Sequence, residues 1–131
     1  MEVLYNLVKT QSLKYEPPDQ AEFDGMVLAA TTKLKDAGLV GLSADSQFTL
    51  VYGAAHALAL AALRWHGYRS DKRYTVFQCL THTLNLENKK WRVLDQCHRR
   101  RNLAEYEGHM DLDVRLLQEL TAITEELLER V

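Results

Sequence analysis

The sequence predicts an all-α protein, an antiparallel up-and-down bundle of about five to six helices. Apolar residues recur at spacings of three and four in successive segments, and residues that cap or stop helices separate these segments. No two alternating apolar segments flank a hairpin turn. With 131 residues, of which 47% are hydrophobic and 26% charged, the chain is expected to form one soluble domain around one core.

Residues 1–18 are predicted to form a short helix and a proline-containing linker, and residues 19–131 the bundle. The first helix has its apolar residues on one face: Val3, Leu4, Leu7 and Val8. Pro17-Pro18 ends any helical run, because proline disfavours helical geometry in the residue before it. Asp19 and Glu22 then resemble a capping pair that begins a second helix, which Gly38 ends.

The third helix is predicted to begin after Ser43 and to run to His66, with Gly67 as its stop. Its surface is unusually small: Gly53, Ala54, Ala55, Ala57, Ala59, Ala61 and Ala62. Small residues let a neighbouring backbone approach closely, so this helix is expected to be central. The same surface could instead permit contact with a second copy of the chain.

Three further helices complete the predicted bundle, and together with the third they are expected to form its core. Ser70 is expected to cap a fourth helix, which breaks at Asn85-Leu86. The fifth runs from about Glu87 to Glu107 and ends at Gly108. Asp111 is expected to cap the last helix, whose apolar residues repeat at the helical period: Leu116, Leu120, Ile123 and Leu127.

Several classes of protein are disfavoured. A net charge of −2 argues against a wholly basic nucleic-acid coat, although it allows a local basic patch. Cys79 and Cys97 lack the paired spacing of a zinc site, and no phosphate-loop, dinucleotide or zinc-protease motif is present. We therefore expect no metal and no cofactor. The apolar stretch 50–63 is too short for a membrane span and no signal peptide is recognisable, which favours a cytoplasmic protein.

The fifth predicted helix carries the most distinctive side chains. Six basic residues lie along it, with Asp95 as the only acid between the first and the last: Lys89, Lys90, Arg92, Arg99, Arg100 and Arg101. They form either an ordinary solvated face or a site for phosphate, an anion that clustered arginines suit. Under the second interpretation, the residues expected to contact nucleic acid are Arg99, Arg100, Lys89 and Lys90.

Helical geometry aligns several of these side chains in one polar column, because residues three and four apart share a face. The column contains Asp95, His98 or Arg99, Asn102 and Tyr106, and Arg101 lies beside it. Arginine can hold a phosphate, asparagine can orient it, and histidine or tyrosine can exchange a proton. The candidate catalytic residues are therefore Arg101, Asn102, Tyr106 and His98. Tyr52, His56 and Asp95 are expected to support them or simply to pack.

The string Arg101-Asn102-Leu103-Ala104-Glu105-Tyr106 resembles the signature of HEPN domains: Arg, a polar residue, a short spacer and then His, or Tyr in one branch. Tyr52-Gly53-Ala54-Ala55-His56 resembles the Tyr-x-Ala-Ala run on an earlier helix of these domains. The resemblance covers most of residues 43–131. A second literal match, Arg92 with His98, lacks the Asn after Arg.

The resemblance implies a helical bundle that forms a homodimer, with the motif facing a cleft between subunits. Many members are metal-independent RNases that act as toxins or in phage defence. Some Tyr-type members pair with a nucleotidyltransferase antitoxin that adds AMP to the tyrosine. Others are non-catalytic modules that bind a nucleotide, nucleic acid or protein.

Position 106 is Tyr rather than His, and tyrosine, with an ordinary pKa near 10, is a poor general base at neutral pH. Both an RNA-cleaving protein and an interaction module therefore remain open.

Overall fold

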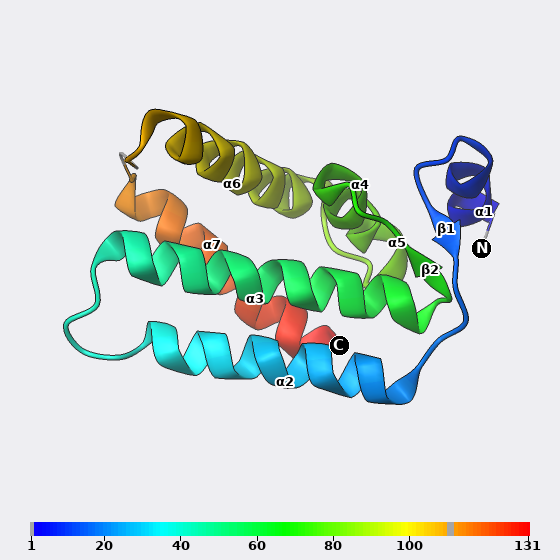
Figure 1. Cartoon of the computed structure of the whole chain (residues 1–131), viewed down its shortest axis with the longest axis horizontal. Helices are drawn as coiled ribbons and strands as arrows, with labels where there is room; N and C mark the ends of the chain where they lie inside the picture. The colour runs from blue at the N-terminus through cyan, green and yellow to red at the C-terminus, as the bar shows by residue number, and fades with distance from the viewer. Residues whose placement is uncertain (1, 110–111) are drawn as a thin grey trace.

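The computed structural model describes residues 2–109 and 112–131, and it confirms an all-α bundle. Its long helices are α2 (Gln20–Ala37), α3 (Ala44–Trp65), α6 (Asn88–Glu107) and α7 (Val114–Arg130). Successive long helices run in opposite directions, and α3 lies between α2 and α6 (Figure 1). The antiparallel up-and-down arrangement follows from the short connections between consecutive helices.

The ends of the long helices follow local capping chemistry. Asp19 Oδ1 accepts a first-turn N–H of α2 at 2.9 Å, and Ser43 Oγ accepts one of α3 at 3.1 Å. Gly108 ends α6 with a φ of 83°, a left-handed conformation that costs glycine little. The cap of α7 is Asp113, two residues later than expected. Asp111, the predicted cap, lies outside the described residues.

The fourth predicted helix is wrong in its bounds. Two short helices replace it, α4 (Arg73–Gln78) and α5 (Leu80–Thr83). Ser70 does not cap α4, because the N-cap position is Lys72. The Ser70 hydroxyl accepts the Lys72 N–H at 3.1 Å and donates to the Ser12 carbonyl at 2.8 Å, which ties this turn to the N-terminal segment. The break before α6 occurs where expected, with Asn85 at a φ of 56°.

The N-terminal helix α1 (Glu2–Lys9) is followed by a two-residue strand, β1 (Lys14–Tyr15). This strand pairs antiparallel with β2 (Tyr68–Arg69), which places Tyr15 opposite Tyr68. Strands this short have no detectable alternation of apolar and polar residues, so the sequence did not predict them. The pairing holds α1 at one end of the bundle, where Figure 1 shows it.

A buried arginine fastens the linker to the end of α3. Arg64 is 2% exposed, and its guanidinium pairs with Glu22 on α2 at 2.5 Å. It also donates to the carbonyls of Glu16 at 2.8 Å and Pro17 at 2.7 Å. Arg69 pairs with the carboxylates of Glu16 and Glu22, each at 2.6 Å. The Glu22 carboxylate therefore joins α2 to α3 and β2 rather than acting in a capping pair.

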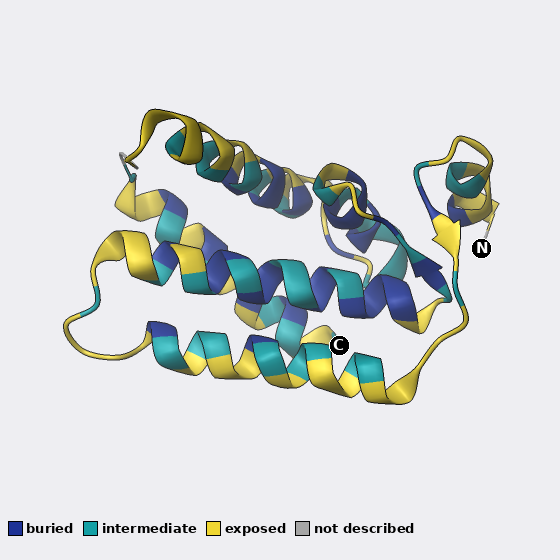
Figure 2. Ribbon diagram, viewed as in Figure 1, coloured by how far each residue is buried: buried dark blue, intermediate teal, exposed yellow. Residues whose placement is uncertain are grey.

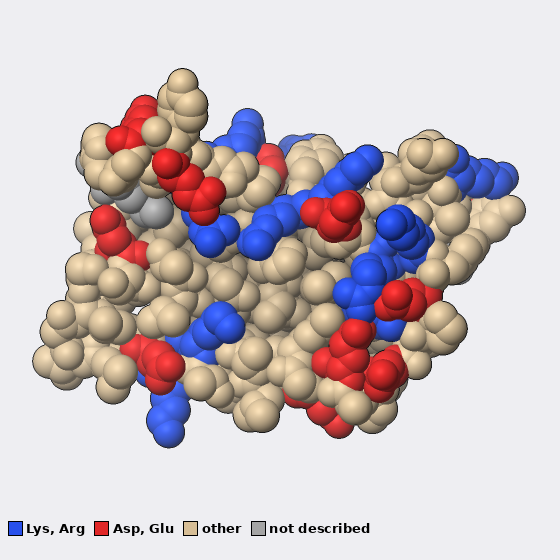
Figure 3. All heavy atoms as spheres, viewed as in Figure 1, with Lys and Arg blue, Asp and Glu red and all other residues tan. Residues whose placement is uncertain are grey.

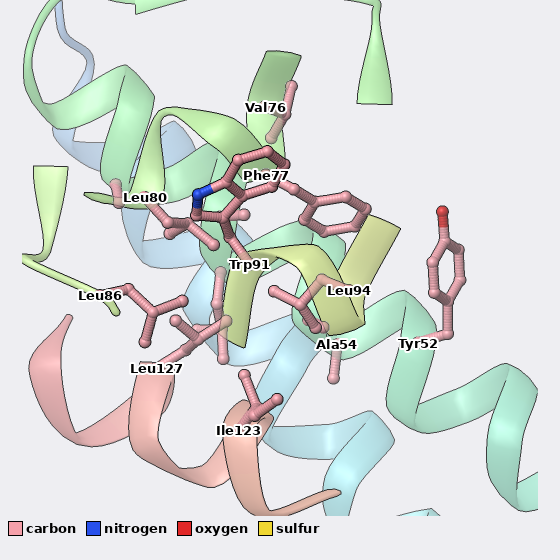
Figure 4. Close-up of a cluster of buried hydrophobic side chains, with 14 of the residues drawn as sticks. Tyr52, Ala54, Val76, Phe77, Leu80, Leu86, Trp91, Leu94, Ile123 and Leu127 are labelled. Atoms are coloured by element: carbon pink, nitrogen blue, oxygen red, sulfur yellow. The ribbon is translucent and has the colours of Figure 1, made fainter. Parts of the chain in front are cut away.

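The core is one cluster centred on α3, as Figure 2 shows by burial. All four predicted core residues of α7 are buried: Leu116, Leu120, Ile123 and Leu127. Buried alanines of α2, which the predicted core omitted, also contribute: Ala30 and Ala37. Figure 4 shows Phe77, Trp91 and Leu94 among the side chains that fill the space around α3.

The small residues of α3 serve this internal core. Ala54, Ala55, Ala59 and Ala61 are all at most 1% exposed within the single chain. By length and composition, α3 could cross a membrane, but more than half of its apolar window is buried inside the bundle, as in a core helix. The small-residue surface thus gives no separate support to a dimer.

Candidate active site

His98 on α6 joins side chains from three helices. Its Nδ1 lies 3.0 Å from the hydroxyl of Tyr52 on α3, and its Nε2 lies 3.3 Å from Nδ2 of Asn102. The Tyr52 hydroxyl also accepts a hydrogen bond from Nη1 of Arg73, on α4, at 3.1 Å. We call Tyr52, Arg73, His98, Arg101 and Asn102 the His98 cluster.

The orientation of the Asn102 amide favours one tautomer of His98. With Nδ2 of Asn102 toward the ring, His98 Nε2 is the acceptor and the tautomer that fits carries its hydrogen on Nδ1. Nδ1 then donates to the Tyr52 oxygen, which also accepts from Arg73. The Nε2 lone pair points toward Asn102, which is exposed and is the last residue of this hydrogen-bond network.

Two guanidinium groups converge on the Tyr52 ring. The guanidinium carbon of Arg101 lies 5.3 Å from the ring centre and that of Arg73 lies 5.4 Å from it. Within the described residues, Arg73 has no ion pair, and Arg101 has only a 3.7 Å contact with the exposed Glu105. Figure 3 shows Lys and Arg side chains gathered where α6 lies over α3. Two like charges beside one ring form a favourable place for an anion.

Tyr52 is the fixed part of the cluster. Its ring is 1% exposed and packs between Phe48 and Phe77. Figure 4 shows its hydroxyl pointing away from the hydrophobic cluster. Burial raises the pKa of Tyr52, and the Arg73 hydrogen bond opposes that rise. The hydroxyl therefore stays protonated and positions His98 rather than exchanging a proton.

The histidines of the site are held in their neutral form. Burial lowers the pKa of His98, and the positive charge of Arg73 lowers it further, against the opposing effect of Asp95. His56, one turn after Tyr52 on α3, packs edge-on against Phe77, and burial lowers its pKa to about 4. A neutral His98 can accept a proton near pH 7.

The basic residues at the start of α6 do not join the cluster. Lys90 pairs with Glu126 at 2.5 Å, and Lys89 contacts Glu87 at 3.4 Å. Their charges are thus largely offset by acids. Arg92, from the second literal match, lies against the Trp91 ring at 5.6 Å.

Closer to His98, Asp95 is buried and pairs with the exposed Arg99 at 3.0 Å. Arg100 is half-buried on the same helix. Asp95 therefore acts on His98 through its charge, while Arg99 extends from the surface beside it. Neither arginine contacts the Tyr52 ring.

Tyr106 stands apart from the residues with which it was grouped. It is 91% exposed, and within the described part of the chain it makes no side-chain hydrogen bond. Sequence reasoning placed it on the polar column, but it is one turn beyond Asn102, near the end of α6 at Gly108. Arg101, in contrast, folds back over Tyr52 and joins the cluster.

Arg73 was missed by the sequence analysis. It begins a helix that was expected to start earlier, and no motif surrounds it. Its approach to Tyr52 depends on how α4 packs against α3 and α6. The signal that could have pointed to it is slight: an arginine, next to Lys72, at the start of a short apolar segment.

The hollows of the molecule differ in how they lie relative to the His98 cluster. A groove of about 590 Å³ between α2, α3 and α7 is lined mainly by apolar residues and holds none of the cluster. A shallow hollow of about 450 Å³ borders Arg101 and includes Asp45, Thr49 and Glu105. Room for a ligand beside the cluster is therefore on the Arg101 side.

Other reactive groups are few. Cys79 and Cys97 are buried free thiols, and burial raises the pKa of each to about 12, so they are poor nucleophiles. Within residues 2–109 and 112–131, no three His, Cys, Asp or Glu side chains are arranged to hold a metal ion.

Comparisons with models of known protein families, with curated proteins and with solved structures find no match to this chain. These comparisons therefore leave the resemblance to HEPN domains untested.

Proposed function

We propose that the chain binds RNA and cleaves it at the His98 cluster. The observation that carries the proposal is the arrangement of a neutral histidine between Tyr52 and Asn102, beside two arginines that converge on one ring. A base and a pair of phosphate-binding cations are the groups that RNA transesterification needs. The contact with phosphates makes binding sensitive to salt.

The reaction would proceed as follows. His98 Nε2 accepts the proton of a ribose 2′-hydroxyl, and the 2′ oxygen forms a bond to the adjacent phosphorus. The bond from phosphorus to the 5′ oxygen breaks, and that oxygen takes a proton from water. Arg73 and Arg101 neutralise the charge on the phosphate, while Asn102 turns from Nε2 to the substrate. The products are a 2′,3′-cyclic phosphate and a 5′-hydroxyl, and His98 returns its proton to solvent.

The proposed reaction retains the HEPN resemblance but changes the residue that serves as the base. Arg101 and Asn102 keep the roles that the motif implies, and His98 takes the place of the reacting base. Tyr106 is exposed enough for a nucleotidyltransferase-type antitoxin to reach it, which favours modification over cleavage as its role. A homodimer and a function as a toxin or in phage defence are proposed from the resemblance.

The test compares the wild type with His98→Gln and Arg101→Ala on single-stranded RNA in the presence of a chelator. The wild type should give 2′,3′-cyclic phosphate ends by mass spectrometry. His98→Gln should reduce the rate about 100-fold or more, and Arg101→Ala should reduce cleavage and abolish any toxicity on expression. His66→Gln, at an exposed histidine at the end of α3, is the matched control. Wild-type protein that binds RNA without cutting it would identify an interaction module instead.

A further inference from the structure

Three tyrosine rings gather where the N-terminal segment meets β2. The ring centre of Tyr15 lies 5.3 Å from that of Tyr68 and 6.4 Å from that of Tyr5. Tyr68 is buried beneath, whereas Tyr15 is 57% exposed and Tyr5 is 46% exposed. Single exposed aromatic residues are ordinary, but adjacent exposed rings on a buried third form a surface suited to binding.

Positive charge accompanies these rings. The ammonium of Lys9 lies 4.7 Å from the centre of the Tyr5 ring, and Lys14 precedes Tyr15 in β1. Within the described part of the chain, neither lysine has a carboxylate within ion-pairing distance. Exposed aromatic rings beside uncompensated lysines are the usual surface of proteins that bind single-stranded nucleic acid.

Groups of basic side chains lie between these rings and the His98 cluster. Figure 3 shows separate groups of Lys and Arg side chains at the α1 end, near β2 and α4, and at the seam between α6 and α3, with acidic and uncharged surface between them. Along this course the chain supplies Lys72 and Arg73 at the start of α4. Arg69 contributes little charge, because Glu16 and Glu22 pair with it.

The separation suits an extended strand. Trp65 lies thirteen positions after Tyr52 on α3, which is roughly 20 Å at the helical rise. The paired Tyr15 and Tyr68 follow just beyond that end of the helix. Surfaces that stack single strands cover about 4–16 nucleotides. One continuous strand could therefore place a phosphate at Arg73 and Arg101 while a more distant base meets Tyr15.

We propose that Tyr5 and Tyr15, with Lys9 and Lys14, form a base-stacking platform for single-stranded RNA whose scissile phosphate lies at the His98 cluster. The inference rests on the proposed RNA cleavage and specifies the form of its substrate. Bases in a duplex stack on one another and cannot lie on a tyrosine ring, so the platform selects unpaired RNA.

The test measures the fluorescence anisotropy of a labelled oligouridine of about 12 nucleotides, with His98→Gln as the background so that the probe stays intact. Adding Tyr15→Ala should weaken binding about 5- to 150-fold, the range for loss of one stacked base. Tyr15→Phe should bind as the background protein does, because it keeps the ring. Trp65→Ala is the matched control, since Trp65 is also 57% exposed but packs against Phe23.

The outcomes separate the two proposals. If the wild type cleaves RNA but Tyr15→Ala leaves affinity unchanged, the platform is wrong and the proposed function stands. If the wild type neither binds nor cleaves RNA, both are overturned. If Tyr15→Ala leaves RNA affinity unchanged but lowers binding to vesicles rich in phosphatidylserine, the surface is a membrane contact and the platform is overturned.

Discussion

Nδ1 of His98 lies 3.0 Å from the hydroxyl of Tyr52, although the two residues are 46 positions apart in the chain. Their rings are nearly parallel, with an interplanar angle of 10°. Tyr52 is packed into the core and His98 lies at its edge, so the hydrogen bond transfers the rigidity of α3 to a titratable group on α6. A proton acceptor whose orientation is determined by the core loses little entropy when substrate binds.

Replacing Tyr52 with Phe should therefore impair the site without unfolding the protein. The ring stays, but Arg73 and His98 lose their shared acceptor, so we expect a loss of about 1 kcal/mol in stability and a fall in cleavage rate. NMR of the His98 ring nitrogens should show that Nδ1 no longer holds the proton uniformly. Tyr74→Phe, at an exposed tyrosine that packs against Trp91, is the control and should change none of these. An unchanged rate in Tyr52→Phe would contradict the positioning role.

The pH dependence of cleavage should report the lowered pKa of His98. The proposed base acts as neutral imidazole, so the rate should fall in acid only below the folded pKa of His98, which burial and Arg73 lower from the ordinary histidine value of 6.5. Arg73 contributes to that lowering, and Arg73→Gln should move the acidic limb to higher pH as well as slow the reaction. A limb centred at or above pH 6.5 in the wild type would count against His98 as the base.

His56 should make the fold sensitive to acid. Its pKa is about 4 in the folded state and about 6.5 when unfolded, so below pH 6.5 the unfolded state binds the extra proton. Stability should fall between pH 6.5 and 4, by on the order of 3 kcal/mol from this group. Urea unfolding at several pH values should show that His56→Gln removes this part of the decline. His66→Gln, at an exposed position, should decline as the wild type does.

Arg64 should be the most costly single charge to remove. Arg64→Met leaves the Glu16 and Pro17 carbonyls without their donor and Glu22 without its closest partner, so we expect a loss of about 3 kcal/mol or more. Urea denaturation gives the value. Lys89→Met removes an exposed pair with Glu87 and should cost under about 1 kcal/mol. Similar losses of unfolding free energy in the two variants would show that burial does not determine how much each ion pair stabilises the fold.

Tyr106→Phe should leave RNA cleavage intact, because Tyr106 is exposed and separate from His98. If an antitoxin adds AMP to this residue, the variant should remain toxic and resist neutralisation. Growth on co-expression with a nucleotidyltransferase partner, together with the mass of the purified chain, measures both effects. A loss of cleavage in Tyr106→Phe would return the tyrosine hydroxyl to the reaction itself.

The sequence by itself determined where α2 and α3 begin, where α6 ends, and which face of α7 is buried. Asp19, Ser43 and Gly108 act on groups within a few residues, so their effect can be read without knowing the rest of the fold. The regular repeat through Leu116 and Leu127 is equally local. The pairing of Asn102 with His98, one helical turn apart, also follows from position alone.

Only the tertiary structure decided which polar residues meet. Arg73 reaches Tyr52 because α4 packs against α3, and Tyr106 is left outside because it lies on a solvent-exposed face of α6. The burial of Arg64 depends on the linker at Glu16, which is 48 positions away in the chain and whose carbonyl accepts a hydrogen bond from the guanidinium. Such contacts depend on how each helix is rotated and packed in the bundle, which is set by the sum of many weak apolar contacts and leaves no local pattern in the sequence.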